Sequence, residues 1–329
     1  VAGALAWYTW RRGHVRRYVV RESDLQRLEQ LNGLPQIELY TVPPSPRSAP
    51  LAAQIFADAG FVLLPGAVAP ELCRDLAAAC REEERAMLQR DPGEDGNRGA
   101  GRYSLGEAQK TGHLLHRPEW AALIDLDEVT PVLQQIFEGD DYLCAGAGGD
   151  FVRPGVTEYQ PLHMDLDFPG CRAHPDNRAP VVTLNVALEP LTWRNGPTRI
   201  IPGSHCVKEG WSDAWDPPSQ MEEPEAWRYY TFCPLPAGTA ILRDNRVWHG
   251  GTPNLSDATR FLPNVEFAAP WWCVGATEEF WRNPWKLAPR GMPRQLWSRL
   301  SAYAQHLCRM VVTDKDLDYG VRDGFSYRR

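Results

Sequence analysis

Two histidines and one aspartate in this sequence have the residue types of a metal site. His163 and Asp165 stand two positions apart in the stretch 158–167, so in a β-strand both side chains project from the same face. His249, followed by two glycines, offers a third ligand. Two histidines and one carboxylate form the facial triad that holds non-haem Fe(II) and leaves three coordination positions open. A lone His-x-Asp pair is equally compatible with a histidine that makes only a structural hydrogen bond, so the pair needs support from other motifs.

An arginine follows the last of these residues at a sequence spacing that suits a role in cosubstrate binding. Arg260 follows His249 by eleven positions. The three open positions of a facial triad suit a bidentate keto acid and O2, and a guanidinium binds a carboxylate through two parallel hydrogen bonds. Arg260 is therefore the candidate for the far carboxylate of a keto acid.

Three polar residues near these ligands are weaker candidates for the cosubstrate. Thr183 and Asn185 alternate with bulky apolar residues in 181–189 and are expected to face the interior of a barrel. There they can orient a keto acid or water, or make structural hydrogen bonds. Gln160 falls on the face opposite His163 if the strand is regular, so a cosubstrate role needs a bend at Pro161, and the alternative is a surface glutamine.

Further motifs connect these residues to a known family. An Asn-Gly-Pro turn begins at Asn195, an Ile-Pro-Gly-Ser-His turn begins at Ile201, and an apolar strand ending in Pro65-Gly66 lies upstream. Together with the His-x-Asp pair, the distal histidine and its spaced arginine, these motifs occur in the order found in the phytanoyl-CoA dioxygenase family of Fe(II)/2-oxoglutarate oxygenases. The sequence resembles that family over positions 53–270.

The resemblance implies a fold and an activity. The expected fold is mainly β with flanking helices, around a double-stranded β-helix (jelly-roll, cupin-like) core. The expected cofactors are Fe(II) held by His163, Asp165 and His249, 2-oxoglutarate held by Arg260, and O2. The expected reaction is hydroxylation of a small-molecule or lipid-like substrate with release of succinate and CO2.

Two positions refine what the resemblance implies. Halogenating relatives replace the carboxylate ligand with a small residue, so the presence of Asp165 indicates hydroxylation or a related oxidation. Relatives often carry a serine two residues after the distal histidine, where it helps to bind the cosubstrate carboxylate. This sequence has Gly251 there, and the nearest hydroxyl belongs to Thr252, which is the candidate to replace that serine.

Two other classes of function remain open on the residues alone. The same three ligands suit a cupin-like Zn or Mn protein that acts as a hydrolase or isomerase. A non-catalytic binding protein with a vestigial site is the second alternative. Arg260 favours the oxygenase, because it has no evident role without a dicarboxylate.

Composition narrows the class of partner and the compartment. The chain has 329 residues, a formal net charge of −7, 13 tryptophans and 29 prolines, which favours one loop-rich β domain and argues against a nucleic-acid partner. A small molecule is the expected substrate. The eight cysteines show no CxxC spacing, so a reducing compartment, either the cytoplasm or an organelle interior, is expected. The oligomeric state is not readable.

The chain divides into three expected regions. Residues 1–50 form an arm and a Pro-rich linker, residues 51–290 the oxygenase domain, and residues 291–329 a C-terminal helix and a loosely held tail. The first ten residues lean apolar and precede several arginines. This pattern is compatible with an arm packed on the domain or with the remnant of an anchor or targeting segment. Membrane association is expected only through these residues.

Hydrophobic periodicity and the positions of proline and glycine predict the individual elements. Helices are expected at 51–59, 70–89, 271–281 and 294–310. Strands are expected at 61–64, 151–153, 158–167, 181–189 and 261–268, with the Gly-rich run 145–149 leading into the second of them. The acidic, Trp-rich segment 206–230 reads either as a lid over the site or as a flap packed on the barrel exterior.

Overall fold

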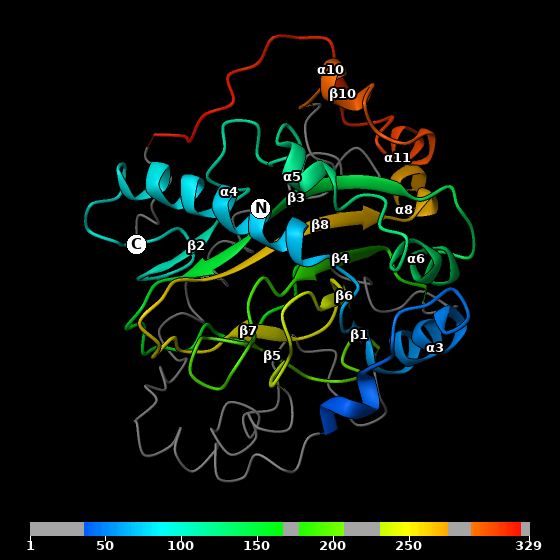
Figure 1. Cartoon of the computed structure of the whole chain (residues 1–329), viewed down its shortest axis with the longest axis horizontal. Helices are drawn as coiled ribbons and strands as arrows, with labels where there is room; N and C mark the ends of the chain where they lie inside the picture. Colours follow the sequence, from blue (N-terminus) through cyan, green and yellow to red (C-terminus); the bar gives the residue numbers. More distant parts are fainter. Residues whose placement is uncertain (1–35, 167–177, 207–230, 276–290, 324–329) are drawn as a thin grey trace.

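The computed structural model describes residues 36–166, 178–206, 231–275 and 291–323. Its central element is a six-stranded antiparallel sheet (Figure 1). The strands in spatial order are β1 (Phe61–Leu64), β6 (Ala240–Asp244), β4 (Val181–Val186), β8 (Arg260–Ala268), β3 (Leu143–Val152) and β2 (Arg102–Ser104). The strands predicted at 61–64, 181–189 and 261–268 are confirmed, and so is a β core with flanking helices.

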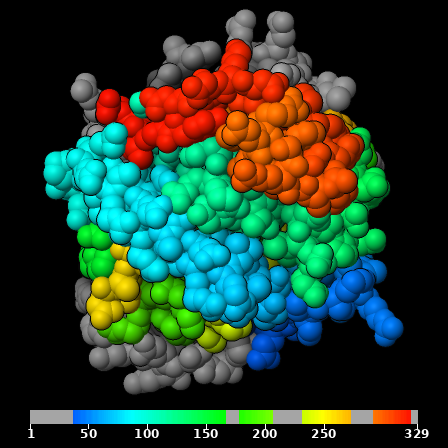
Figure 2. Space-filling model, turned by 45° about the horizontal axis from the view of Figure 1, so that its top comes forward, coloured from blue at the N-terminus to red at the C-terminus, as the bar shows by residue number. Residues whose placement is uncertain are grey.

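Helices cover one face of this sheet. The longest, α4 (Pro70–Leu88), crosses the sheet in Figure 1 and forms much of the surface seen in Figure 2. It begins at a proline, which suits the first turn of a helix. The other helical elements are η1 (Gln36–Tyr40), α3 (Ala49–Ala59), α5 (Pro118–Ala121), α6 (Thr130–Ile136), α8 (Pro270–Gly275), α10 (Arg294–Trp297) and α11 (Ala302–Leu307). The helices predicted at 51–59 and 70–89 are confirmed.

Alternation along each strand gives the sheet two different faces. In β8, Phe261, Val265 and Phe267 belong to the large hydrophobic cluster under the helices. The intervening Asn264 and Glu266 project from the opposite face, because successive side chains of a strand alternate. One face of the sheet is therefore an apolar core, and the other carries polar and charged side chains.

A second, smaller layer lies over the polar face. It consists of β5 (Thr198–Ile200) paired antiparallel with β7 (His249–Gly251). Isolated bridges from His163 to His249 and from Asn195 to Asn254 extend it. A cavity between the two layers is lined from the sheet by residues such as Glu266 and from the second layer by Thr198 and His249.

Two element predictions need correction. The Gly-rich run 145–149 does not precede a strand but lies inside β3. A Cβ on Gly148 would come within 3.0 Å of the Cα of Gly106, so glycine lets the two backbones meet. The single helix predicted at 294–310 is divided into α10 and α11, because Ser301 accepts a hydrogen bond from the Ala304 amide (3.0 Å) and starts a new helix.

The segments flanking the sheet pack more closely than their composition suggests. In the predicted linker, Val42 is buried and its amide donates to Leu63 O (2.9 Å). In the tail, which was predicted to be loosely held, Gly320 accepts from the Lys110 amide (2.8 Å) and the Arg322 amide donates to Ala108 O (2.7 Å). These backbone hydrogen bonds attach both segments to the domain. The boundaries at 50 and 290 stay predictions.

Several predictions concern residues outside the described ranges. These are the N-terminal arm through residue 35, the Trp-rich segment from 207 to 230, and the end of the helix expected at 271–281. Among the described helices, none is long and apolar enough to cross a membrane.

A separate two-stranded sheet lies in the C-terminal region. Its strands β9 (Met292–Pro293) and β10 (Val312–Thr313) pair in parallel beside α10.

Candidate metal centre

The segment that carries His163 and Asp165 is irregular, which corrects the prediction of a β-strand at 158–167. It makes single bridges instead of a ladder. The His163 amide donates to His249 O (2.8 Å), the His249 amide donates back to His163 O (2.9 Å), and the Asp165 amide donates to Asn245 O (3.0 Å). These hydrogen bonds to the β6–β7 region, and not strand pleating, place the two side chains together.

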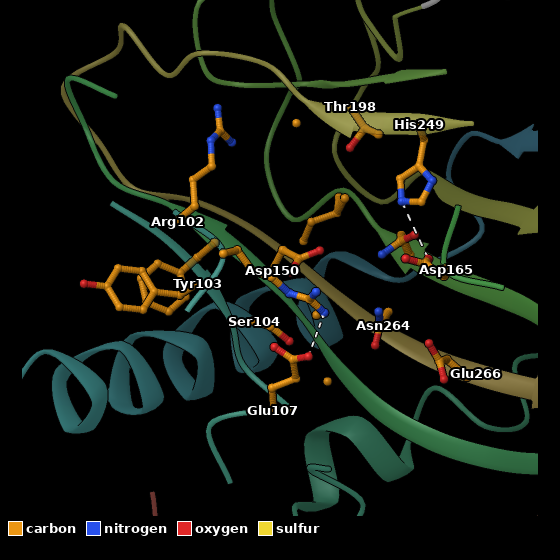
Figure 3. Close-up of a pocket in the computed structure, with 18 of the residues that line it drawn as sticks. Arg102, Tyr103, Ser104, Glu107, Asp150, Asp165, Thr198, His249, Asn264 and Glu266 are labelled. Carbon is orange, nitrogen blue, oxygen red and sulfur yellow. Dashed lines mark ion pairs between the residues drawn. The ribbon is translucent and has the colours of Figure 1, made fainter. Parts of the chain in front are cut away.

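The three expected ligands converge. One donor atom from each of His163, Asp165 and His249 lies within 4.8 Å of the others. His163 Nε2 is 3.7 Å from Asp165 Oδ1, and His249 Nε2 is 3.6 Å from Asp165 Oδ2. Figure 3 shows the contact between His249 and Asp165 as a dashed line. Small side-chain adjustments would bring all three donors to one ion.

Both histidines are oriented for metal binding through the same ring atom. His163 Nδ1 is 2.9 Å from Pro161 O, and His249 Nδ1 is 3.0 Å from Val247 O. A carbonyl oxygen only accepts, so each Nδ1 is assigned the proton and each Nε2 keeps a lone pair. At His249 a donor, Arg243 Nη1, also lies 3.3 Å from Nδ1, and the shorter contact with Val247 O decides the assignment. Burial lowers the pKa of both imidazoles, which favours the neutral form that a metal requires.

Arg243 fixes the charge and the orientation of the Asp165 carboxylate. Its Nη2 donates to Asp165 Oδ2 (2.6 Å) from a side chain that is 7% exposed. Burial raises the pKa of the Asp165 carboxyl, but the positive charge of Arg243, helped by the two histidines, outweighs it and holds the pKa well below its usual range. Asp165 is therefore ionised and oriented. Arg243 is not among the residues predicted from the sequence, although an arginine directly after the apolar run 240–242 is a visible signal.

Arg260 lines the same cavity from the first position of β8. It is 3% exposed, and its Nε donates to Gly196 O (3.0 Å). Its Nη1 is buried without a hydrogen-bond partner in the described part of the chain, and burial lowers the pKa of the guanidinium. A buried donor of this kind is costly to leave unpaired, so the site suits an anion that reaches Nη1.

The four secondary candidates divide into two groups. Gln160 and Asn185 line the cavity, and the Gln160 Oε1 also accepts from the Gly251 amide (3.0 Å). Thr183 donates to Asn245 Oδ1, and Thr252 donates to Pro197 O. Neither threonine is among the residues that line the cavity in the described ranges, and the replacement of the serine by Thr252 stays a prediction.

Further polar and charged residues of the cavity wall come from the alternation of β3 and β8 and from the turn that follows β2. Besides Arg102 on β2, the wall includes Glu107, Asp150, Asn264 and Glu266. Burial raises the pKa of Glu107 to about 7 and that of Glu266 to about 7, although Arg98 opposes the shift at Glu107. Figure 3 shows these carboxylates on the sheet side of the cavity. Polar residues at alternate positions within apolar strands were the signal that could have identified Asp150, Asn264 and Glu266.

The sheet register separates the cavity into two ends. Arg102, Val152 and Arg260 are direct cross-strand neighbours and form one row. In another row, Thr183 is the direct neighbour of Glu266 on one side and of Arg243 on the other. The two rows are six positions apart on β8, which is about 20 Å along the backbone, and side chains from both rows line the same cavity. The unpaired Arg260 thus marks one end of the cavity, and the Arg243–Asp165 pair marks the other.

This donor set fits a divalent metal. It offers two neutral imidazole nitrogens and one ionised carboxylate, and it leaves positions open for exogenous ligands. Hydrogen bonds at both Nδ1 atoms and at the carboxylate fix the ligands in the way that known metal sites use. Arg260, at the other end of the same cavity, supplies a cation for the tail of an anionic ligand.

Comparisons with known proteins give matches in sequence and in structure. The sequence profile of the family described as phytanoyl-CoA dioxygenase (PhyH) matches residues 56–262. AviO1 from Streptomyces viridochromogenes Tue57 is similar with a TM-score of 0.47 and 20% identity, over 70% of this chain and 97% of that one. The non-heme alpha-ketoglutarate-dependent epimerase SnoN from nogalamycin biosynthesis is similar with a TM-score of 0.49 and 18% identity, over 68% and 82%.

Proposed function

Because the chain belongs to the phytanoyl-CoA dioxygenase family, we propose that it is an Fe(II)- and 2-oxoglutarate-dependent dioxygenase that hydroxylates a small molecule with release of succinate and CO2. Fe(II) and 2-oxoglutarate are the cofactors that membership of this family implies. The observation that carries the proposal is the convergence of His163, Asp165 and His249 within 4.8 Å, with each histidine fixed through Nδ1 and free at Nε2.

Each residue of the site has a proposed role. His163 Nε2, His249 Nε2 and the Asp165 carboxylate hold Fe(II), and Arg260 binds the distal carboxylate of 2-oxoglutarate through its unpaired Nη1. With 2-oxoglutarate and O2, Fe(II) supplies the oxidant for the substrate carbon as the keto acid loses CO2. The retained Asp165 ligand favours transfer of oxygen over transfer of halide.

The remaining contribution of the chain is preorganisation. Arg243 keeps Asp165 ionised and turned toward the histidines. Burial keeps both imidazoles neutral. The two layers bury His249 and Arg243, whereas the side chains of His163 and Asp165 stay 32% and 30% exposed, which leaves the metal position accessible from the cavity.

The described cavity wall favours a small hydrophilic substrate over a lipid-like one. Beyond the three metal ligands and Arg260, it presents Glu107, Asp150, Asn264 and Glu266. Polar groups in a pocket reject a partner that leaves them without hydrogen bonds. A substrate with hydroxyl or amino groups satisfies these acceptors, whereas a long acyl chain would not.

The two layers support the jelly-roll form of the fold. We propose that the six-stranded sheet and the β5–β7 pair are the two sheets of a double-stranded β-helix. In such a fold the metal lies between the sheets, which is where His249 of β7 meets Asp165.

The test is release of succinate from 2-oxoglutarate by the purified protein reconstituted with Fe(II) under air. Release that requires Fe(II), and that increases with a polar fraction of a metabolite extract, would support the proposal and lead to the substrate. Absence of release, together with Zn or Mn as the bound metal in elemental analysis, would instead support a cupin-like hydrolase or isomerase. Absence of any metal would support a binding protein with a vestigial site.

A further inference from the structure

A second buried arginine lies at the same end of the cavity as Arg260. Arg102 is 6% exposed, lines the cavity and is separated from Arg260 by one strand in the same cross-strand row. Its Nη2 donates to Glu158 O (2.8 Å) and Thr252 O (2.6 Å). In the described part of the chain no carboxylate lies within ion-pair distance of it. Figure 3 shows its side chain extending from β2 toward the layer that carries Thr198 and His249.

The other guanidinium nitrogen occupies the space beside Gly251. A Cβ placed on Gly251 would lie 2.6 Å from Arg102 Nη1 and 3.3 Å from Gln160 Oε1. The backbone of Gly251 is not in the left-handed region, so its conformation does not require glycine. Space is the constraint, because Arg102 fills the volume that a side chain at position 251 would need.

Two buried guanidinium groups in one row favour an anion between them, because the nearby Asp150 carboxylate supplies only one negative charge to both. Like charges repel more strongly in the interior than in water, and an unpaired buried cation is costly. Neither Arg102 nor Arg260 has an ion-pair partner among the described residues, and both line the cavity. Arginine is the side chain best suited to bind a carboxylate through two hydrogen bonds. The pair therefore has the chemistry of a carboxylate site with one cation on each side.

We propose that Arg102 binds the distal carboxylate of 2-oxoglutarate together with Arg260, in the space that a serine side chain at position 251 would fill. This inference rests on the proposed function, because it concerns the same cosubstrate. Two arginines at this end also make the distal carboxylate obligatory. A 2-oxo acid without that group, such as pyruvate, leaves both cations unpaired and binds poorly.

The first experiment measures cosubstrate affinity without turnover. 2-Oxoglutarate is titrated calorimetrically into the protein loaded with Mn(II) in place of Fe(II). Arg102→Gln should bind it about 10- to 100-fold more weakly, the loss expected for a charge-assisted hydrogen bond, and should discriminate less against pyruvate. Arg153→Gln is the control, because Arg153 follows Val152 of the same row but donates to Glu84 Oε1 (2.8 Å) and is not among the residues lining the cavity. It should leave the affinity unchanged.

The second experiment combines a serine at position 251 with the removal of the Arg102 side chain. Gly251→Ser in the wild-type background should weaken binding, because its Cβ displaces Arg102 Nη1. The same change in an Arg102→Ala background should strengthen binding severalfold, since a serine hydroxyl then enters the vacated space. This reversal of sign distinguishes direct binding from a structural role of Arg102, because a purely structural contact would not be restored by serine.

The outcomes distinguish failure of the role proposed for Arg102 from failure of the proposed dioxygenase function. If the wild-type protein binds no 2-oxoglutarate, the proposed function is overturned and the inference with it. If the wild type binds and Arg102→Gln binds equally well, only the role of Arg102 is overturned. Additive losses from Gly251→Ser and Arg102→Ala would also overturn it. Folding of each variant is checked by thermal unfolding, and Arg102→Lys, which keeps the charge, should retain more affinity than Arg102→Gln.

Discussion

Replacement of Arg260 by alanine should separate binding from folding. A carboxylate that loses its buried guanidinium partner loses charge-assisted hydrogen bonds and keeps its desolvation penalty. Arg260 is 3% exposed, so water replaces it only in the space left by the truncated side chain. We expect 2-oxoglutarate to bind about 2–4 kcal/mol more weakly, which is about 30- to 700-fold.

The same substitution should cost the free protein little stability. Arg260 makes no ion pair among the described residues, and the interaction lost is its hydrogen bond to Gly196 O, worth about 0.5–1.5 kcal/mol. Removal of an uncompensated buried charge offsets that loss. Arg246 is the matched control, because it is 0% exposed and its Nη2 lies 2.6 Å from Asp244 Oδ2. Arg246→Ala should destabilise the fold by about 3–5 kcal/mol.

The assay combines 2-oxoglutarate titration with thermal unfolding, both in Mn(II)-loaded protein without O2. The wild-type melting temperature should rise with 2-oxoglutarate, as ligand linkage requires, and that of Arg260→Ala should not. Wild-type affinity in Arg260→Ala would refute the reasoning. So would a loss of stability in Arg260→Ala as large as that in Arg246→Ala, because it would make Arg260 a structural residue.

The remaining predictions concern the metal, pH and packing. His163→Ala or Asp165→Ala should abolish Mn(II) binding, measured by electron paramagnetic resonance, and iron-dependent succinate release; turnover in either variant would contradict the ligand assignment. Burial lowers the pKa of His116 to about 4, so the unfolded chain takes up this proton first and the free energy of unfolding should fall by roughly 1–3 kcal/mol as pH drops from 6.5 to 4. His116→Gln should flatten that slope in urea unfolding at pH 7 and pH 5, and an unchanged slope would place the titration elsewhere. Gly148→Ala should destabilise the protein by about 1–3 kcal/mol in the same assay, because its Cβ meets the Gly106 backbone; wild-type stability would show that the two segments separate freely.

The sequence pattern predicted correctly those helices and strands whose ends are set by nearby glycine and proline residues. The helix that ends at Gly60 and the strand from Phe61 to Leu64 were readable because an apolar run is bounded by glycine and proline. The Gly-rich part of β3 was misread, since glycine is a poor strand former and only its contact with Gly106 explains its presence. Position 301 divided a predicted helix because its serine caps a new one.

The metal residues were identified for a reason that turned out to be only partly correct. The spacing of His163 and Asp165 suggested one face of a regular strand, whereas single hydrogen bonds to His249 and Asn245 place them in an irregular segment. Residue type and order were sufficient to name the candidates. The geometry that brings them together comes from backbone hydrogen bonds between residues 80 and 86 positions apart, which no local period reports.

The sequence by itself determined the kinds of ligand, their order and the presence of a spaced arginine, because these are properties of residue type and short-range spacing. Tertiary structure alone decided that Arg243 holds the Asp165 carboxylate and that Arg102 fills the space beside Gly251. Arg102 and Gly251 are 149 positions apart and lie on strands of different layers. Only the packing of those layers makes them neighbours, because burial forces each polar side chain in the cavity to find a partner from another element.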